Sequence, residues 1–146
     1  MFKQITVFLE NKPGRMEDVT GCLANANINI HALSIADTTD FGILRMIVSH
    51  PDEAVGLLKE NDFMAKTTDV IAVAIGYEPG SLHKVLRQLS AFDISVEYMY
   101  AFTSRHADYD AVVILSLRDQ ETVLDKLKNT SIPLLGDDFL AQLNQA

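Results

Sequence analysis

The residue types best suited to hold a ligand lie in one short segment, ENKPGRM (residues 10–16), between a predicted strand and a predicted helix. The first N–H groups of a helix have no partner within the helix, and the helix dipole places partial positive charge there. A carboxylate could therefore dock on the backbone at Gly14, Arg15 and Met16. The carboxamide of Asn11 both donates and accepts hydrogen bonds, which suits a zwitterion. The alternative is a tight Pro-Gly turn in which Asn11 only bonds the local backbone.

The same turn occurs twice, because Pro79-Gly80 repeats Pro13-Gly14 at an offset of 66 residues. Five of eighteen positions are identical at this offset. Apolar residues also recur in both copies at three- to four-residue spacing, which predicts a helix with one apolar face. These residues are Met16, Val19, Leu23 and Ala26 in the first copy and Leu82, Val85, Leu89 and Phe92 in the second. An internal repeat therefore organises the chain.

Each copy predicts the element order β-α-β-β-α-β. The predicted strands are residues 3–9, 28–36, 43–48 and 64–68, then 70–76, 94–102, 111–117 and 132–135. Proline or acidic residues at 51–53 and 119–121 predict the start of the second helix of each copy, and residues 136–138 predict a final short helix. This order is typical of the ferredoxin-like α+β fold, with helices on one face of an antiparallel sheet. The boundary near Asp69 predicts two domains, residues 1–69 and 70–146.

A β-α-β-β-α-β unit with Asn-Lys-Pro-Gly between its first strand and first helix resembles an ACT domain. Nearly the whole chain resembles a stand-alone tandem ACT-domain protein. The resemblance implies a regulatory module that binds a small amino acid where two such domains meet, with no cofactor. The contacts come from the loop after strand one of one domain and the start of strand two of the other. The implied ligand-binding residues are Asn11, Pro13, Gly14, Arg15, Met16, Asn29 and Ile30, with Tyr77, Pro79, Gly80, Ser81, Leu82, Ser95 and Val96 in the second copy.

The second copy departs from this pattern at two positions. Tyr77 stands where the first copy has Asn11, and Ser95 stands where it has Asn29. The second copy therefore lacks both carboxamides. We expect the first-copy loop to dominate the site, with the second copy supplying a facing wall or a degenerate site. An alternative for Asn29 is an ordinary turn residue at the start of a strand.

Composition excludes several functional classes. Twelve Lys and Arg against twenty Asp and Glu give a net charge of −8, which disfavours binding to nucleic acid. The longest apolar run, Val70–Ile75, has six residues, whereas a membrane-spanning helix needs about 20. The start of the sequence lacks the features of a secretory signal, and the lone Cys22 has no partner for a disulfide, so a cytoplasmic protein is expected.

No arrangement of residues favours catalysis. The four histidines lie far apart and show no metal-ligand spacing. Cys22 falls among the apolar positions of a helix, which favours a buried, inert thiol. The acidic residues of the two hairpin loops are read as turn residues, although acid-base chemistry is the rival interpretation. They are Asp37, Asp40, Asp108 and Asp110.

Two functions of different classes follow. The first is a non-enzymatic module that senses a small amino acid as a homodimer and regulates a partner enzyme or transporter through its contacts. The second is an interaction protein without a ligand, in which the paired units serve as an assembly platform. Replacing Asn11 separates the two, because only the first needs its carboxamide.

Overall fold

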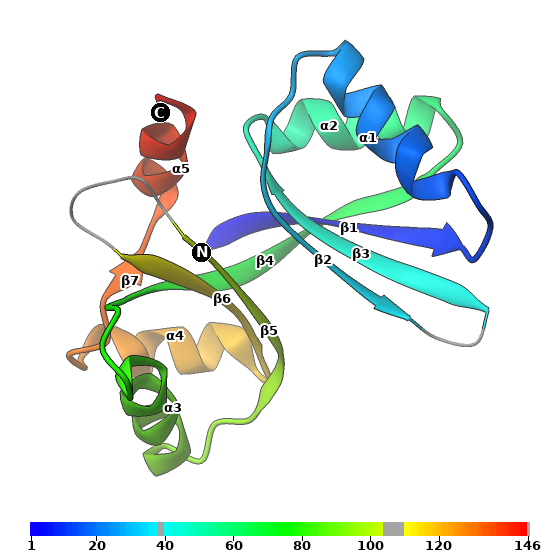
Figure 1. Ribbon diagram of the computed structural model, residues 1–146. Coiled ribbons are helices and arrows are strands. Elements are labelled where there is room, and N and C mark those ends of the chain that lie inside the picture. Colours follow the sequence, from blue (N-terminus) through cyan, green and yellow to red (C-terminus); the bar gives the residue numbers. More distant parts are fainter. Residues whose placement is uncertain (38–39, 104–109, 146) are drawn as a thin grey trace. The chain divides into compact units, whose positions relative to one another are not determined.

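The computed structural model describes residues 1–37, 40–103 and 110–145, and the chain forms two compact units. The first unit is Lys3–Thr68. The second unit is Asp69–Ala146 together with Met1–Phe2. Figure 1 labels the elements of both units. Of the helices in the described ranges, none has the length and apolar character needed to cross a membrane.

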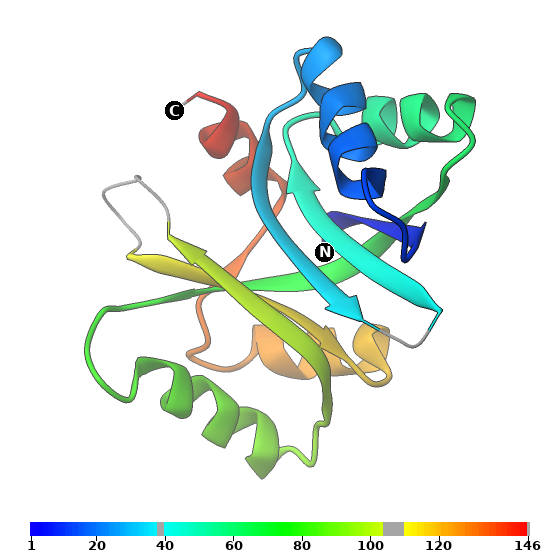
Figure 2. The same cartoon turned by 45° about the vertical axis from the view of Figure 1, so that its right-hand side comes forward.

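The first unit has one antiparallel sheet with the strand order β2-β3-β1-β4. Its elements are β1 (Phe2–Glu10), α1 (Arg15–Asn25), β2 (Ile30–Asp37), β3 (Phe41–Val48), α2 (Pro51–Glu60) and the first part of β4 (Met64–Ile75). Both helices cover the same face of the sheet (Figures 1 and 2). Alternate residues of β1 point toward them, so Val7 packs with Leu23 of α1 and Leu58 of α2 in one fully buried core.

The second unit repeats this arrangement. Its elements are the rest of β4, α3 (Ser81–Ala91), β5 (Val96–Thr103), β6 (Ala111–Leu117), α4 (Gln120–Lys128), β7 (Leu134–Leu135) and α5 (Asp137–Asn144). The strand order is β4-β6-β5, and β7 pairs with β4. Helices α3 and α4 cover one face, and α5 lies on the other, where the Phe139 ring is 6.1 Å from that of Phe2 (Figures 1 and 2). The predicted ferredoxin-like α+β fold is confirmed.

The repeat extends to unusual backbone conformations. Gly14 and Gly80 precede α1 and α3 with φ angles of 88° and 92°. Asn27 and Asp93 follow the same two helices, and each has a φ of 58°. This left-handed region favours glycine and tolerates asparagine and aspartate. The chain thus enters and leaves its first helix in the same way in both units.

Three predictions at the ends of elements were wrong. The strands expected at 64–68 and 70–76 form one strand, β4, because Thr67, Thr68 and Asp69 contain neither glycine nor proline to end it. The strand expected at 132–135 shrinks to two residues, since Pro133 lacks the N–H that a ladder needs. Phe92 is 42% exposed because it lies at the C-terminus of α3, beyond its apolar face.

The aromatic row of β5 lies as the alternation of a strand predicts. Tyr98, Tyr100 and Phe102 are half-buried, whereas Met99 and Ala101 between them are exposed. Register places Tyr100 beside Ile114 and Phe102 beside Val112. The three aromatic side chains therefore lie along one face of the sheet.

Truncating a core leucine in either unit should destabilise the protein. Leu23→Ala and Leu89→Ala each remove a fully buried side chain, so each should lower the free energy of unfolding by about 2–5 kcal/mol. Urea titration followed by circular dichroism measures the loss. Met64→Ala is the control, since Met64 is 71% exposed and its truncation should change stability by less than about 0.5 kcal/mol. A loss below about 1 kcal/mol for both leucines would contradict the assigned cores.

Candidate functional site

A hollow of about 350 Å³ opens beside the loop between β1 and α1 in the first unit. This volume is at the lower end of the roughly 300–1,000 Å³ found for small-molecule sites. Residues 9–16 line it together with Ile35 of β2 and Gly42 of β3. The loop residues named from the sequence, Asn11, Pro13, Gly14, Arg15 and Met16, therefore lie together around one hollow.

The start of α1 leaves backbone donors bare at this hollow. Gly14 precedes the helix in the left-handed conformation, and no side chain caps the helix. The first helical hydrogen bond runs from the Asp18 N–H to the Gly14 carbonyl at 2.9 Å. Among the described residues, the N–H groups of Met16 and Glu17 have no hydrogen-bond partner. These two donors and the helix dipole favour an anion there.

Asp37 holds the carboxamide of Asn11. The Asn11 Nδ2 donates to Asp37 Oδ1 at 3.0 Å, which brings the last residue of β2 to the loop. The Asn11 Oδ1 lies close to Gly42. A Cβ atom added at Gly42 would lie 3.7 Å from this oxygen and 3.5 Å from the Ile35 side chain. A glycine at position 42 therefore leaves room beside the amide oxygen. Asp37 therefore holds the loop through this hydrogen bond and is more than a turn residue.

The charged side chains of the loop are largely balanced locally. Lys12 Nζ lies 2.8 Å from Glu10, and this ammonium group lowers the pKa of the Glu10 carboxyl. The Arg15 guanidinium stacks 4.4 Å from the centre of the Phe63 ring and pairs with Asp18 at 3.3 Å. Arg15 therefore directs its charge toward Phe63, away from the bare start of α1.

Asn29 and Ile30 lie at the opposite end of the unit. Ile30 begins β2 beside Val48, whereas Asp37 ends β2 beside Gly42. Eight residues of strand separate the two ends by about 23 Å. Two hydrogen bonds join Ser49 to the backbone of Asn29. The Asn29 N–H donates to Ser49 Oγ at 3.0 Å, and the Ser49 N–H donates to the Asn29 carbonyl at 2.9 Å. One unit alone does not bring these residues to the loop.

The matching loop of the second unit is bonded differently. The Tyr77 N–H donates to Asp110 Oδ2 at 3.2 Å, while the Tyr77 side chain is 77% exposed. Ser81 Oγ donates to the Glu78 carbonyl at 2.9 Å beside the Gly80 turn, which follows Pro79 and precedes Leu82. Elsewhere in this unit Val96 begins β5, and the Ser95 carbonyl accepts from the Arg118 N–H at 3.2 Å.

The other candidates play lesser parts. Cys22 is half-buried rather than fully buried, because α1 turns it toward Asn61, whose Nδ2 lies 3.5 Å from its sulfur. Asp40 is exposed, and Asp108 lies outside the described residues. No group of three or more His, Cys, Asp or Glu within the described ranges could hold a metal ion. The sequence did not predict that Ile35 and Gly42 line the loop hollow. Only the register of the hairpin formed by β2 and β3 brings them there.

Comparison with known proteins decides the family. A model of the ACT domain pair matches residues 1–137. The chain belongs to the ACT domain pair family. A protein from Bacteroides thetaiotaomicron is 43% identical and superposes with a TM-score of 0.87, over 97% of this chain and 96% of that one. None of the curated proteins matches this sequence.

More distant structures share the fold of this ACT domain pair. The regulatory subunit of aspartate kinase from Thermus thermophilus is 17% identical, with a TM-score of 0.57 over 86% of this chain and 90% of that one. The corresponding subunit from Thermus flavus is 16% identical, with a TM-score of 0.54 over 77% and 81% of the two chains. The predicted resemblance to tandem ACT proteins is thereby confirmed.

Replacing glycine by alanine tests the left-handed turn before α1, because the free energy of unfolding should change in opposite directions at Gly14 and Gly21. Neither Gly14 nor Gly21 has an atom within 4 Å of an added Cβ, so only the backbone conformation decides. Gly14→Ala should lower the free energy of unfolding by about 1–2 kcal/mol, because its φ is 88°. Gly21→Ala, inside α1, should raise it by about 1 kcal/mol. Thermal and urea unfolding measure both, and equal effects would contradict the assigned turn.

Proposed function

We propose that this ACT domain pair is a non-catalytic regulatory module that binds a small amino acid at the loop between β1 and α1. The observation that carries the proposal is the hollow where the uncapped start of α1 faces the Asn11 carboxamide. An α-amino acid presents a carboxylate and an ammonium group a few ångströms apart. The hollow offers one kind of partner for each.

The two groups of the ligand meet complementary surroundings. The carboxylate binds the N–H groups of Met16 and Glu17, where the helix dipole is positive. The ammonium group donates to the Asn11 carboxamide oxygen. Asp37 fixes this amide and adds a negative charge nearby, which favours the cationic end. The side chain of the amino acid lies against Ile35 and the apolar wall around it.

A second copy of the chain completes the site. β2 lies at the end of the strand order, and its Leu33 and Ile35 side chains are 48% and 52% exposed. An exposed edge strand readily pairs with another strand. Two β2 strands paired antiparallel about a twofold axis place the start of one beside the end of the other. Ile30 and Asn29 of one protomer then lie near Asp37 and the loop of its partner.

Regulation follows from this arrangement through linkage. A ligand held by two protomers binds the dimer better than the separate chains, so it shifts the population toward the dimer. A partner enzyme or transporter that contacts only one assembly state would then respond to the amino acid. The sequence departure at Tyr77, together with the bond from its N–H to Asp110, supports a site dominated by the first unit.

Asn11→Ala should abolish the stabilisation of the protein by its amino acid. In a thermal-shift screen against the twenty amino acids, one or two should raise Tm selectively, since a ligand at a hundredfold excess over Kd contributes about 2.7 kcal/mol. The variant removes the carboxamide that accepts from the ammonium group. The selective rise in Tm with that amino acid should therefore be lost in the variant.

Asn25→Ala is the matched control, because Asn25 is exposed at the last position of α1, away from the loop. It should retain the full response. A panel that leaves the Tm of the unmodified protein flat would contradict the sensor and favour the ligand-free assembly platform. A selective response that survives undiminished in Asn11→Ala would move the binding site of that amino acid away from this loop.

Ile35→Lys should convert the dimer into monomers. The substitution places two like charges at the paired edges, and a charged edge strand resists pairing. Analytical ultracentrifugation should show the monomer mass for Ile35→Lys, and the thermal response to the amino acid should fall with it. Met99→Lys on the edge strand of the second unit is the control and should remain dimeric. Identical masses for the unmodified protein and Ile35→Lys would contradict pairing through β2.

A further inference from the structure

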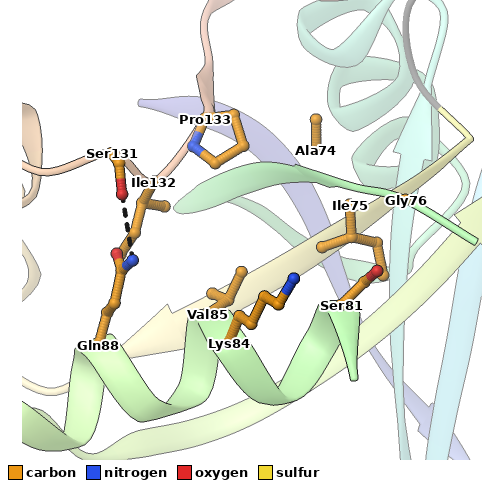
Figure 3. A pocket seen from close by; sticks show the side chains of 10 residues that line it. All are labelled: Ala74, Ile75, Gly76, Ser81, Lys84, Val85, Gln88, Ser131, Ile132 and Pro133. Carbon is orange, nitrogen blue, oxygen red and sulfur yellow. Dashed lines mark hydrogen bonds between the residues drawn. The ribbon is translucent and has the colours of Figure 1, made fainter. Parts of the chain in front are cut away.

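A second hollow lies entirely within the second unit. It has a volume of about 250 Å³ and opens between α3, the end of β4 and the segment that follows α4 (Figure 3). Ile75, Val85 and Ile132 give it an apolar floor. The polar groups around it come mainly from α3, in the side chains of Ser81, Lys84 and Gln88. None of these residues belongs to the loop hollow of the first unit.

Gln88 brings a buried polar atom that no neighbour satisfies. Its Nε2 donates to Ser131 Oγ at 3.1 Å, as Figure 3 shows. Its Oε1 is buried and has no hydrogen-bond partner among the described residues. A buried acceptor without a donor costs about 1–3 kcal/mol, and most such groups in proteins are satisfied. This oxygen has almost no exposed surface, so a ligand with an N–H or O–H group supplies the missing donor once the Gln88 amide turns toward the hollow.

Lys84 brings a positive charge to the same hollow. Its side chain rises from α3 toward Ile75 and Ser81 (Figure 3). No carboxylate in the described ranges forms an ion pair with it. Lys84 and Gln88 are four residues apart on one helix, so their Cβ atoms lie about 5–6 Å apart. One small molecule can therefore reach both.

The corresponding place in the first unit is balanced differently. The repeat offset sets Arg15, Asp18 and Cys22 against Ser81, Lys84 and Gln88. Phe63 is the first buried residue after α2, and Ile132 is the first buried residue after α4, so these two also correspond. In the first unit the Arg15 guanidinium covers Phe63 and pairs with Asp18.

In the second unit this internal cation and its carboxylate are both gone. Ser81 is shorter than arginine, Ile132 is smaller than phenylalanine, and Lys84 reverses the charge of Asp18. The place thus changes from one with its own ion pair to one with an exposed ammonium group above an apolar floor. An anion from outside the chain would meet that ammonium group with no competing carboxylate among the described residues.

We propose that this hollow binds a small carboxylate with a hydrogen-bond donor on the neighbouring carbon, that is, an α-amino or α-hydroxy acid. The carboxylate binds Lys84 Nζ, and the donor bonds Gln88 Oε1. The carbon skeleton lies against Ile75 and Ile132. The volume is below the range typical of drug-sized ligands, which restricts the site to small metabolites. This site is separate from the loop site and does not depend on it.

Four three-carbon probes separate the parts of this proposal: L-alanine, L-lactate, propionate and propylamine. Each is titrated into the full-length chain, labelled with ¹⁵N, to about 50 mM, which saturates a site with a Kd of about 1 mM. L-Alanine or L-lactate should shift the amide signals of residues 81, 84, 88 and 131. Propionate, which lacks the donor, should bind roughly tenfold more weakly. Propylamine, which lacks the carboxylate, should leave these signals in place.

Lys84→Met removes the ammonium group and keeps the apolar stem, so it should weaken binding roughly tenfold or more. Lys126→Met removes an exposed lysine of α4 in the same unit and should bind as the unmodified protein does. Asn11→Ala should also bind normally, which separates this site from the loop site. The proposal is overturned if no probe shifts these amides, or if Lys84→Met keeps the full affinity. Equal affinities for L-lactate and propionate would overturn the role of Gln88.

Discussion

The site in the first unit depends on the left-handed backbone at Gly14. This conformation turns the chain from β1 into α1 without a side chain that caps the helix, so the first N–H groups remain available. A serine or aspartate at this position would cap the helix and occupy those donors itself. Because an added Cβ would meet no neighbour, the glycine is needed for its backbone conformation and not for space. The turn therefore fixes both the direction of the helix and the chemistry at its start.

The second unit shows that the same backbone can support different chemistry. Gly80 repeats the turn with nearly the same φ. Around it, Ser81 bonds the Glu78 carbonyl and Asp110 accepts from the Tyr77 N–H, so its loop is held by its own residues. The hollow of this unit is lined instead by Lys84 and Gln88 of α3. The two units thus place different polar side chains beside the same junction of strand and helix.

Much of the fold could be predicted because its signals are local. The helices follow from apolar spacing, and the spacing repeats at 66 residues, so the element order of one unit supports that of the other. The continuity of β4 could not be predicted, since Asp69 begins the second unit and yet lies inside one unbroken strand. Ile35 and Gly42 join the loop hollow through the register of β2 and β3, a long-range property. The orphan oxygen of Gln88 likewise depends on packing that no pattern of residue types encodes.

The two hollows differ in what their occupation can control. A ligand at the loop hollow, in the proposed dimer, contacts the partner protomer, so its binding free energy depends on assembly and assembly depends on it by the same amount. A ligand between α3 and the segment after α4 contacts one unit only. It stabilises that unit against unfolding but has equal affinity for monomer and dimer, so it shifts no assembly equilibrium. Under these proposals, position relative to the edge strand β2, rather than affinity, determines which of the two proposed sites regulates a partner.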